Sequence, residues 1–432
     1  MNAKQAYETI PSMAGFADGA LGLYISIPFC RSKCTWCNFA SGVYPASSHA
    51  RYIDRVLEDM AAAPAYAQRM GVQLPSRVDT VYLGGGTPSV LAPEQISRLF
   101  AAIRRQFQLD PDAEITVECA PGQIADPTLE ALVQAGVNRV SLGVQSFVDR
   151  EAQVSGRLHN RAIVEADIAR LRQAGLANLS VDLIAGLAHQ THASWDESLD
   201  ALIASGVPHA SVYMLEVDED SRLGRELLSG GARYHAGLVP SDEAIAQMYP
   251  HAIRRLAAAG LSQYEISNFA RPGMASQHNL RYWQRRPYLG LGLDASSMLR
   301  AVDPESASEG AEPPHVLRTT TTDALPAYLA ADEPPETAWL SPARQLEEAW
   351  FLGLRLNAGV PVAALQREFG KAAVAPALEV AARLQDEGLL TSTAEASREA
   401  DGESIRLTPQ GQLFSNDVFQ EFLTLDAQPA HQ

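Results

Sequence analysis

The sequence predicts an α/β fold built from parallel strands, because strand-like apolar runs alternate with segments of helical periodicity through the first half of the chain. The six runs, rich in Val, Ile, Leu and Tyr, span 21–29, 78–84, 114–119, 139–144, 179–184 and 210–216. Helical spacing falls between them, at 48–70, 93–107, 127–135, 161–174 and 194–205. Such alternation is typical of parallel β/α packing. Periodicity alone leaves a barrel and an open doubly wound sheet both open.

The ends of the predicted helices fit this interpretation. Asp126 precedes Pro127 at an expected first helical position, and Gly136 and Gly175 follow two helix ends. Proline is tolerated at the first helical position, and glycine is favoured just beyond the last.

Beyond about residue 240 the pattern changes. A helix is predicted over 240–259, and 302–314 is rich in Pro, Glu, Ser and Gly, as solvated loops are. Further on, the sequence predicts three helices, at 344–354, 362–369 and 375–387. Two short strands, at 389–391 and 405–407, and a last helix that begins at 408–411 follow them. Helices followed by a small β wing indicate a winged-helix-like domain.

We therefore expect four parts. They are an N-terminal tail (1–20), an α/β domain (21–240), an accessory region (241–341) and a C-terminal, mainly helical, winged-helix-like domain (342–425).

The charge of the chain excludes several partner classes. With 51 acidic and 34 basic residues its net charge is −17, so neither nucleic acid nor an anionic membrane is favoured as a partner. This also argues against DNA binding by the winged-helix-like domain. No run reaches the length of a transmembrane segment, and 1–20 lacks the pattern of a signal peptide. We expect a cytoplasmic protein.

Three of the four cysteines crowd into one short motif after the first predicted strand. Cys30, Cys34 and Cys37 form a C-x3-C-x2-C cluster. Three thiolates can hold three corners of a cubic iron–sulfur cluster and leave one iron open for a ligand. A structural zinc site wants four ligands, and no histidine precedes His49. Four cysteines are too sparse for a disulfide-stapled scaffold.

Polar or glycine-rich elements follow the other predicted strands at the same end. Gly84-Gly85-Gly86-Thr87-Pro88 follows the second, Glu118 and Gln145 end the third and fourth, and Asp182 lies late in the fifth. In parallel β/α barrels the chemistry sits at these C-terminal strand ends.

The cysteine spacing and these elements resemble the radical S-adenosyl-L-methionine (SAM) family. The resemblance implies a partial (β/α)6 barrel, with a [4Fe-4S] cluster bound by Cys30, Cys34 and Cys37. SAM would chelate the open iron, and an electron from the cluster would cleave it to methionine and a 5′-deoxyadenosyl radical. The resemblance also implies the SAM-binding residues: Tyr24, Trp36, Gly85, Gly86, Thr87, Glu118, Gln145, Arg157 and Asp182.

Each implied residue has a plainer interpretation. The glycines can form an ordinary tight turn, and Glu118 can form a structural salt bridge, because a buried carboxylate needs a partner. Gln145, Arg157 and Asp182 can be ordinary polar contacts. In the family, Arg157 pairs with the SAM carboxylate, and Asp182 lies near the ribose.

Further motifs resemble the oxygen-independent coproporphyrinogen III oxidase-like group, and within it the HemW heme chaperones. Segments 23–30 and 84–88 carry the first resemblance. Phe39 stands where the true oxidases have a fourth cysteine, and 277–283 carries the H-N-x-x-Y-W motif associated with heme binding. The resemblance implies that heme is bound by His278, Asn279, Tyr282 and Trp283. A lone histidine is more often structural than a ligand.

Two functions follow from this resemblance. One is a chaperone that delivers heme to an acceptor protein; the other is a radical enzyme acting on a tetrapyrrole, so enzymatic activity stays open, as does a homodimer. The chain departs from the family pattern at Asn38, Cys119 and Ala188-His189. Because side chains alternate along a strand, we expect Cys119 to face the outer helices if Glu118 faces SAM. The alternative is a bulge at Ala120-Pro121 that makes Cys119 a fourth cluster ligand.

Overall fold

The computed structural model describes residues 19–302, 314–331, 333–394 and 403–423. The predicted N-terminal tail and the predicted loop at 302–314 therefore lie almost wholly outside the described residues.

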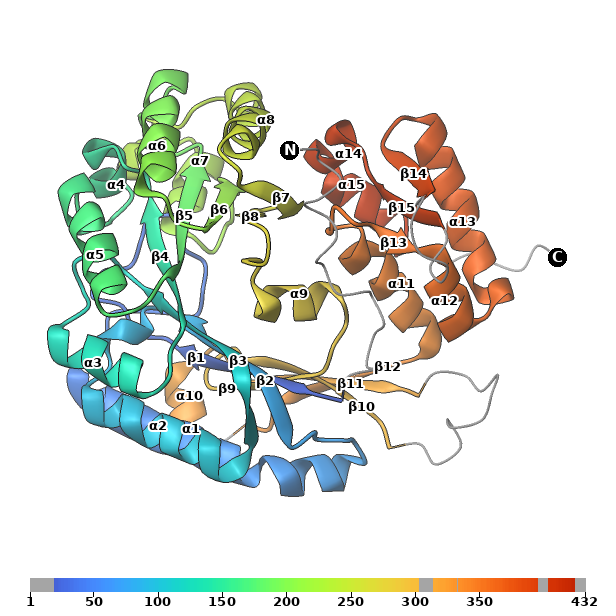
Figure 1. Cartoon of the computed structure of the whole chain (residues 1–432), viewed down its shortest axis with the longest axis horizontal. Helices are drawn as coiled ribbons and strands as arrows, with labels where there is room; N and C mark the ends of the chain where they lie inside the picture. The colour runs from blue at the N-terminus through green and yellow to red at the C-terminus, as the bar shows by residue number, and fades with distance from the viewer. Residues whose placement is uncertain (1–18, 303–313, 332, 395–402, 424–432) are drawn as a thin grey trace.

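Six parallel strands lie side by side in chain order and form the centre of the molecule (Figure 1). They are β1 (Leu21–Ile27), β2 (Arg77–Gly85), β3 (Gln108–Cys119), β4 (Arg139–Gln145), β5 (Asn178–Ala185) and β6 (His209–Met214). A doubly wound sheet reverses its strand order, whereas a barrel keeps it. The sheet runs from β12 at one edge to β7 at the other, so it curves without closing. The prediction of a partial barrel is confirmed.

Helices cover the outer face of this sheet. They are α1 (Ala46–Met70), α2 (Pro93–Gln106), α3 (Asp126–Gln134), α4 (Asp149–Val154), α5 (Arg161–Gln173) and α6 (His192–Ser205). Alternate strand residues such as Leu23 and Ile25 are fully buried in the core between strands and helices. Tyr24 lies between them on the opposite, inner face.

The sheet is extended on both sides by strands that the sequence did not predict. On one side β9 (Tyr288–Leu291) is parallel to β1 and leads into the antiparallel strands β10 (Ser296–Arg300), β11 (Val316–Thr320) and β12 (Glu336–Leu340). On the other side β8 (Asn268–Ala270) and β7 (Ser262–Glu265) follow β6 in antiparallel order. The connecting helical segments are η2 (Pro88–Val90), α7 (Arg222–Leu228), η3 (Arg233–Leu238), α8 (Asp242–Ala258) and α10 (Leu325–Ala330).

Helix α9 (Gln277–Trp283), which carries the H-N-x-x-Y-W motif, packs against the inner face of the sheet (Figure 1). Its His278 ring stacks on the Tyr82 ring of β2 with centroids 5.2 Å apart. Its Arg281 side chain is fully buried and donates to the carbonyl oxygens of Ala20 and Pro287. The motif therefore fills part of the barrel interior.

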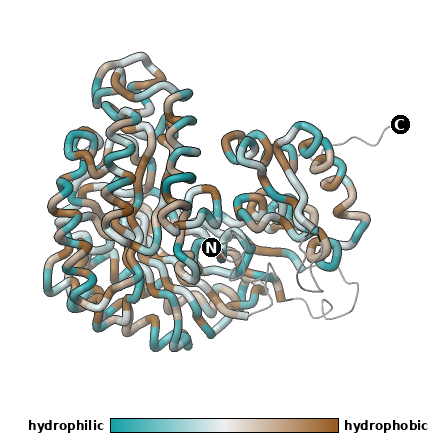
Figure 2. Tube along the Cα trace, turned by 45° about the horizontal axis from the view of Figure 1, so that its top comes forward, coloured by the Kyte–Doolittle hydropathy of each residue, from teal (hydrophilic) through white to brown (hydrophobic). Residues whose placement is uncertain are grey.

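The C-terminal part is mainly helical with a small antiparallel sheet, as the sequence predicts. Its elements are α11 (Pro342–Gly353), β13 (Val360–Pro361), α12 (Val362–Phe369), α13 (Lys371–Asp386), β14 (Leu390–Ala394), β15 (Glu403–Leu407), α14 (Pro409–Leu413) and α15 (Ser415–Gln420). The rings of Trp350 and Phe422 stack 4.8 Å apart in a core separate from that of the barrel. Hydrophobic and hydrophilic stretches alternate along both parts in Figure 2.

Among the described residues, no helix combines the length and the apolar character needed to cross a membrane.

Candidate cofactor-binding site

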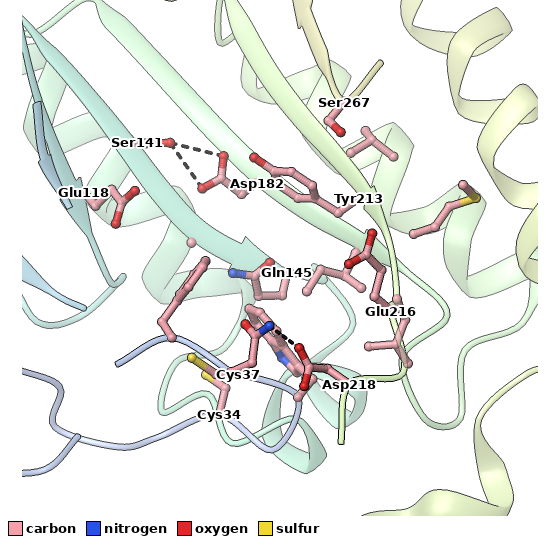
Figure 3. Close-up of a pocket in the computed structure, with 18 of the residues that line it drawn as sticks. Cys34, Cys37, Glu118, Ser141, Gln145, Asp182, Tyr213, Glu216, Asp218 and Ser267 are labelled. Atoms are coloured by element: carbon pink, nitrogen blue, oxygen red, sulfur yellow. Dashed lines mark hydrogen bonds between the residues drawn. The ribbon is translucent and has the colours of Figure 1, made fainter. Parts of the chain in front are cut away.

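A cavity of about 690 Å³ opens at the C-terminal ends of the barrel strands, where the sequence places the chemistry. One side is the cysteine loop, and the floor is formed by the ends of β2 to β6. The opposite side is formed by Arg355 and by residues 413–417 of the C-terminal part. Figure 3 shows the polar side chains that converge on it.

Backbone and side-chain hydrogen bonds fix the cysteine loop between β1 and α1. The Cys30 N–H donates to the carbonyl oxygen of Gly42 at 2.9 Å, and Lys33 Nζ donates to two carbonyl oxygens of the same loop. The Thr35 N–H donates to the Ser155 carbonyl at 3.0 Å, which ties the loop to the turn after α4. At Gly156 in this turn a β-carbon would lie 3.2 Å from the Cys34 Cα, so glycine permits the close approach.

The three thiols of the motif all line the cavity. Burial raises the pKa of Cys30 and Cys34, whereas the nearby Arg157 guanidinium lowers it and favours the thiolates. Within the described residues no three His, Cys, Asp or Glu side chains surround a single point as the ligands of one metal ion do. A four-iron cluster instead places each thiolate on a different iron. Three thiols on one loop suit such a cluster.

The glycine-rich turn after β2 packs against the start of the cysteine loop. A β-carbon on Gly86 would lie 2.6 Å from the Ile27 carbonyl oxygen, and Gly85 has φ 91. Both positions therefore require glycine. The Thr87 N–H donates to the Phe29 carbonyl at 2.8 Å. Gly85, Gly86 and Thr87 line the cavity.

Glu118 lies beside this turn on the inner face of β3. Its carboxylate accepts hydrogen bonds from Tyr82 Oη at 2.7 Å and from the Gly85 N–H at 3.2 Å. Burial, with a smaller contribution from the nearby Asp182, raises the pKa of Glu118 to about 7. A phenol and an amide, rather than the salt bridge considered as the plainer alternative, hold this group. Tyr24 packs close by, its ring stacked 6.2 Å from that of Tyr82.

Gln145, Arg157 and Asp182 converge from neighbouring segments. Gln145 has φ 69, a left-handed conformation rare outside glycine, at an irregularity in the pairing of β4 with β5. A β-carbon on Gly143 would lie 2.4 Å from Arg157 Nη2, so the guanidinium rests on this glycine. Arg157 Nε is buried without a hydrogen-bond partner among the described residues. The carboxylate of Asp182 accepts from Ser141 Oγ at 3.1 and 3.2 Å, and burial raises its pKa.

Trp36 and Cys119 complete the set near the cysteine loop. Trp36 lines the cavity, and its Nε1 is buried without a partner among the described residues. The Sγ of Cys119 lies 3.9 Å from the Val117 carbonyl oxygen, and the residue packs in the barrel core. Burial raises the pKa of Cys119 to about 12. These surroundings support the interpretation of Cys119 as a small apolar filler.

The four residues of the proposed heme motif lie elsewhere, on α9. His278 is 1% exposed; its Nδ1 is 2.9 Å from Thr80 Oγ1 and its Nε2 is 2.8 Å from Tyr282 Oη. Burial lowers the pKa of His278 well below its usual value. Asn279 and Trp283 are half-buried. None of the four is among the described residues that line the cavity.

Several residues that line the cavity were not singled out from the sequence. They are Tyr213 after the middle of β6, Ser267 between β7 and β8, Arg355 after α11, and 413–417 at the end of α14 and the start of α15. No motif marks these positions, and Arg355 and 413–417 reach the cavity because the C-terminal part packs against the barrel.

Comparisons with known proteins agree with this site. The family model of the radical SAM superfamily matches residues 24–202, and that of the HemN C-terminal domain matches residues 340–414. The heme chaperone HemW of Lactococcus lactis is 31% identical over 93% of this chain and 97% of its own length. The Bacillus subtilis HemW is 32% identical over 93% and 98%, respectively.

A mammalian relative and a solved structure are also similar. The mouse mitochondrial radical S-adenosyl methionine domain-containing protein 1 is 31% identical over 78% of this chain and 74% of its own. The solved coproporphyrinogen III oxidase HemN of Escherichia coli superposes with a TM-score of 0.74 at 23% identity, covering 93% of this chain and 90% of that one, which shows a shared fold. The chain belongs to the HemW family of the radical SAM superfamily.

Proposed function

We propose that this chain is a heme chaperone that binds heme and transfers it to an acceptor protein, and that it carries a [4Fe-4S] cluster and SAM. Similarity over nearly the whole chain to two HemW heme chaperones carries the proposal. Cluster thiolates need a reducing compartment, so we place the protein in the cytoplasm.

The cavity offers groups that suit a cluster and SAM. Cys30, Cys34 and Cys37 would hold three irons and leave the fourth for SAM. The unpartnered Arg157 Nε would donate to the SAM carboxylate, since a guanidinium fork suits a carboxylate. With both groups bound, an electron from the reduced cluster would supply the chemistry of SAM cleavage, which yields methionine and a 5′-deoxyadenosyl radical.

The other residues of the site would hold SAM through polar contacts. The glycine turn at Gly85 and Gly86 leaves room for a backbone contact to the SAM amino group. Gln145 and Asp182 face the cavity in Figure 3 and would contact the remaining polar groups of SAM. Trp36 would contact adenine through its backbone.

The contribution of α9 to heme binding remains a prediction. Both ring nitrogens of His278 have hydrogen-bond partners, so iron ligation by His278 requires that one of these bonds breaks. We expect the hydrogen bond between His278 and Tyr282 to be the one that breaks, because Tyr282 is half-buried whereas Thr80 is buried.

The test of the proposed function is a heme titration of the anaerobically reconstituted full chain, followed by absorbance. We expect a saturable Soret band at one heme per chain. A linear response without saturation would contradict heme binding by a defined site.

A second candidate function, radical chemistry on a tetrapyrrole, draws on the same three-cysteine motif. Phe39, in place of a fourth cysteine, disfavours it. Reduced protein incubated with SAM and coproporphyrinogen III should form no protoporphyrinogen. Formation of several molecules of protoporphyrinogen per chain would instead favour the enzyme.

A further inference from the structure

Exposed apolar side chains gather around the mouth of the cavity. Phe39 is 59% exposed, Leu158 62%, Tyr213 43% and Phe414 50%. They come from the cysteine loop, the turn after α4, β6 and the C-terminal part, and all four line the cavity. Exposed apolar side chains that come from separate segments and gather in one place mark a binding surface, whereas apolar residues exposed one by one are common on protein surfaces.

The basic side chains that line the cavity differ in whether they can bind a ligand other than SAM. Lys33 Nζ already donates to the carbonyl oxygens of Phe39 and Ser41 at 3.1 and 3.0 Å. Arg157 rests on Gly143 beside the cysteine loop and belongs to the proposed SAM site. This leaves Arg355 among the described lining residues as a cation free to meet a second ligand.

Arg355 is held in place but is incompletely paired. Its guanidinium lies 4.2 Å from the centroid of the Trp283 ring, a cation–π contact. Its only ion pair among the described residues is a loose one, 4.0 Å from the buried Glu265, and its Nε is buried without a hydrogen-bond partner. The Arg355 side chain is 26% exposed, so a carboxylate in the cavity would meet its terminal nitrogens and not the buried Nε.

Two of the acidic side chains that line the cavity, Glu216 and Asp218, oppose a carboxylate near the cysteine loop, and Asp417 lines the cavity on the C-terminal part. Asp218 accepts a hydrogen bond from Asn38, next to Cys37, and Glu216 lies near it in Figure 3. A ligand with an apolar body and carboxylates at one edge would therefore direct those carboxylates toward Arg355.

We propose that this outer part of the cavity is the heme site. A tetrapyrrole face lies against Phe39, Tyr213 and Phe414, and a propionate carboxylate meets Arg355. Trp283 is then a positioning residue, because it holds Arg355 and does not itself reach the cavity. The inference rests on the proposed heme-chaperone function and places heme away from α9, so the H-N-x-x-Y-W motif would act on heme binding through Trp283 and Arg355 and not through iron ligation by His278.

The test compares heme with its dimethyl ester, which keeps the ring and iron but blocks both carboxylates. In titrations of the reconstituted full chain we expect the ester to bind about tenfold more weakly than heme. Arg355→Gln should weaken heme binding about tenfold and leave ester binding unchanged. Arg271→Gln, an exposed arginine that does not line the cavity, is the matched control and should change neither.

Trp283→Leu separates positioning from folding. Loss of the stacked ring should weaken heme but not ester, whereas a general loss of structure would weaken both. Arg355→Lys should recover part of the lost affinity, because it keeps the charge but not the planar fork.

The outcomes distinguish the two proposals. If the unaltered chain binds neither ligand, the proposed function fails. If it binds heme and ester equally well and Arg355→Gln has no effect, heme binds but this site is wrong. The ester comparison uses the unaltered chain, so it stands even if Arg355→Gln leaves Glu265 unpaired and misfolds.

Discussion

The four cysteines share a chemistry but differ in surroundings. Cys30, Cys34 and Cys37 line the cavity, and burial raises the pKa of Cys30 and Cys34, an effect that the Thr87 hydroxyl at Cys30 and the Arg157 guanidinium at Cys34 partly offset. Cys119 also borders the cavity, but it is packed in the barrel core, where burial raises the pKa of its thiol to about 12. A thiolate is the form that ligates metal. We therefore expect the three cysteines of the loop, and not Cys119, to be the ligands of the proposed cluster.

The first prediction uses this contrast. Alanine at Cys30, Cys34 or Cys37 should abolish the visible iron–sulfur absorbance after anaerobic reconstitution. Cys119→Ala is the matched control and should keep both the cluster and an electron paramagnetic resonance signal that shifts on adding SAM. A full four-iron cluster in Cys34→Ala, or loss of the cluster in Cys119→Ala, would overturn the assignment.

The second prediction concerns the pH dependence of stability through Glu118. Burial raises the pKa of Glu118 to about 7, so the folded state binds the proton more tightly than the unfolded state does. The stabilisation by this group is thus full below the unfolded pKa, near 4.3, and is lost as pH rises through 7, by up to about 3 kcal/mol.

Glu118→Gln should reduce the fall in melting temperature of the cluster-free chain between pH 5 and pH 8. Part of the fall in melting temperature should remain, because burial also raises the pKa of Asp182. The exposed Glu219→Gln serves as control. An unchanged pH dependence in Glu118→Gln would show that this carboxyl is not protonated in the folded chain.

At the scale of elements, local pattern predicted the strands with strong apolar runs. The run 139–144 became β4 (Arg139–Gln145), whereas β3 begins at Gln108, well before the predicted 114, because Asp110-Pro111-Asp112 looks like a turn. Strands β7 to β12 are short and are defined by pairing with one another and with β1 and β6. Strands of so few residues show no periodicity from which such pairing could be predicted.

The site likewise contains residues that could be predicted from the sequence and residues that could not. Glu118, Gln145 and Asp182 could be placed from the sequence, because they sit at the ends of predicted parallel strands that meet at one edge. Arg355 and Phe414 could not, because their position depends on how the C-terminal part packs on the barrel.

The third prediction tests the packing of α9 on β1. A β-carbon on Gly22 would lie 2.4 Å from Arg281 Cδ. Arg281 cannot swing away, because it is fully buried and bonded to two carbonyl oxygens. Gly22→Ala should lower the free energy of unfolding by about 1–3 kcal/mol, measured by chemical denaturation. Gly237→Ala, where the added methyl meets nothing within 4 Å, should be neutral; equal effects would argue against this packing.

At the scale of the whole molecule, a few backbone contacts join two separate cores. The Ile266 N–H donates to the Arg355 carbonyl at 3.1 Å, and the Asn357 N–H donates to the Tyr264 carbonyl at 3.0 Å. This junction places 413–417 over the barrel and so completes the cavity. The cysteine loop and the opposite wall of the cavity therefore belong to parts that are stabilised by different cores.

The last prediction asks whether these cores are energetically distinct. Trp350 is fully buried and stacks on Phe422, so Trp350→Ala should cost about 3–5 kcal/mol. Because the loss falls in the smaller core, hydrogen exchange should quicken across 342–394 and 403–423 and stay slow in β1 to β6. Trp339→Ala, at a position 45% exposed on β12, is the control and should stay within about 0.5 kcal/mol. Faster exchange of equal size in the barrel strands would show that the two cores unfold as one unit, and that the walls of the cavity cannot loosen separately.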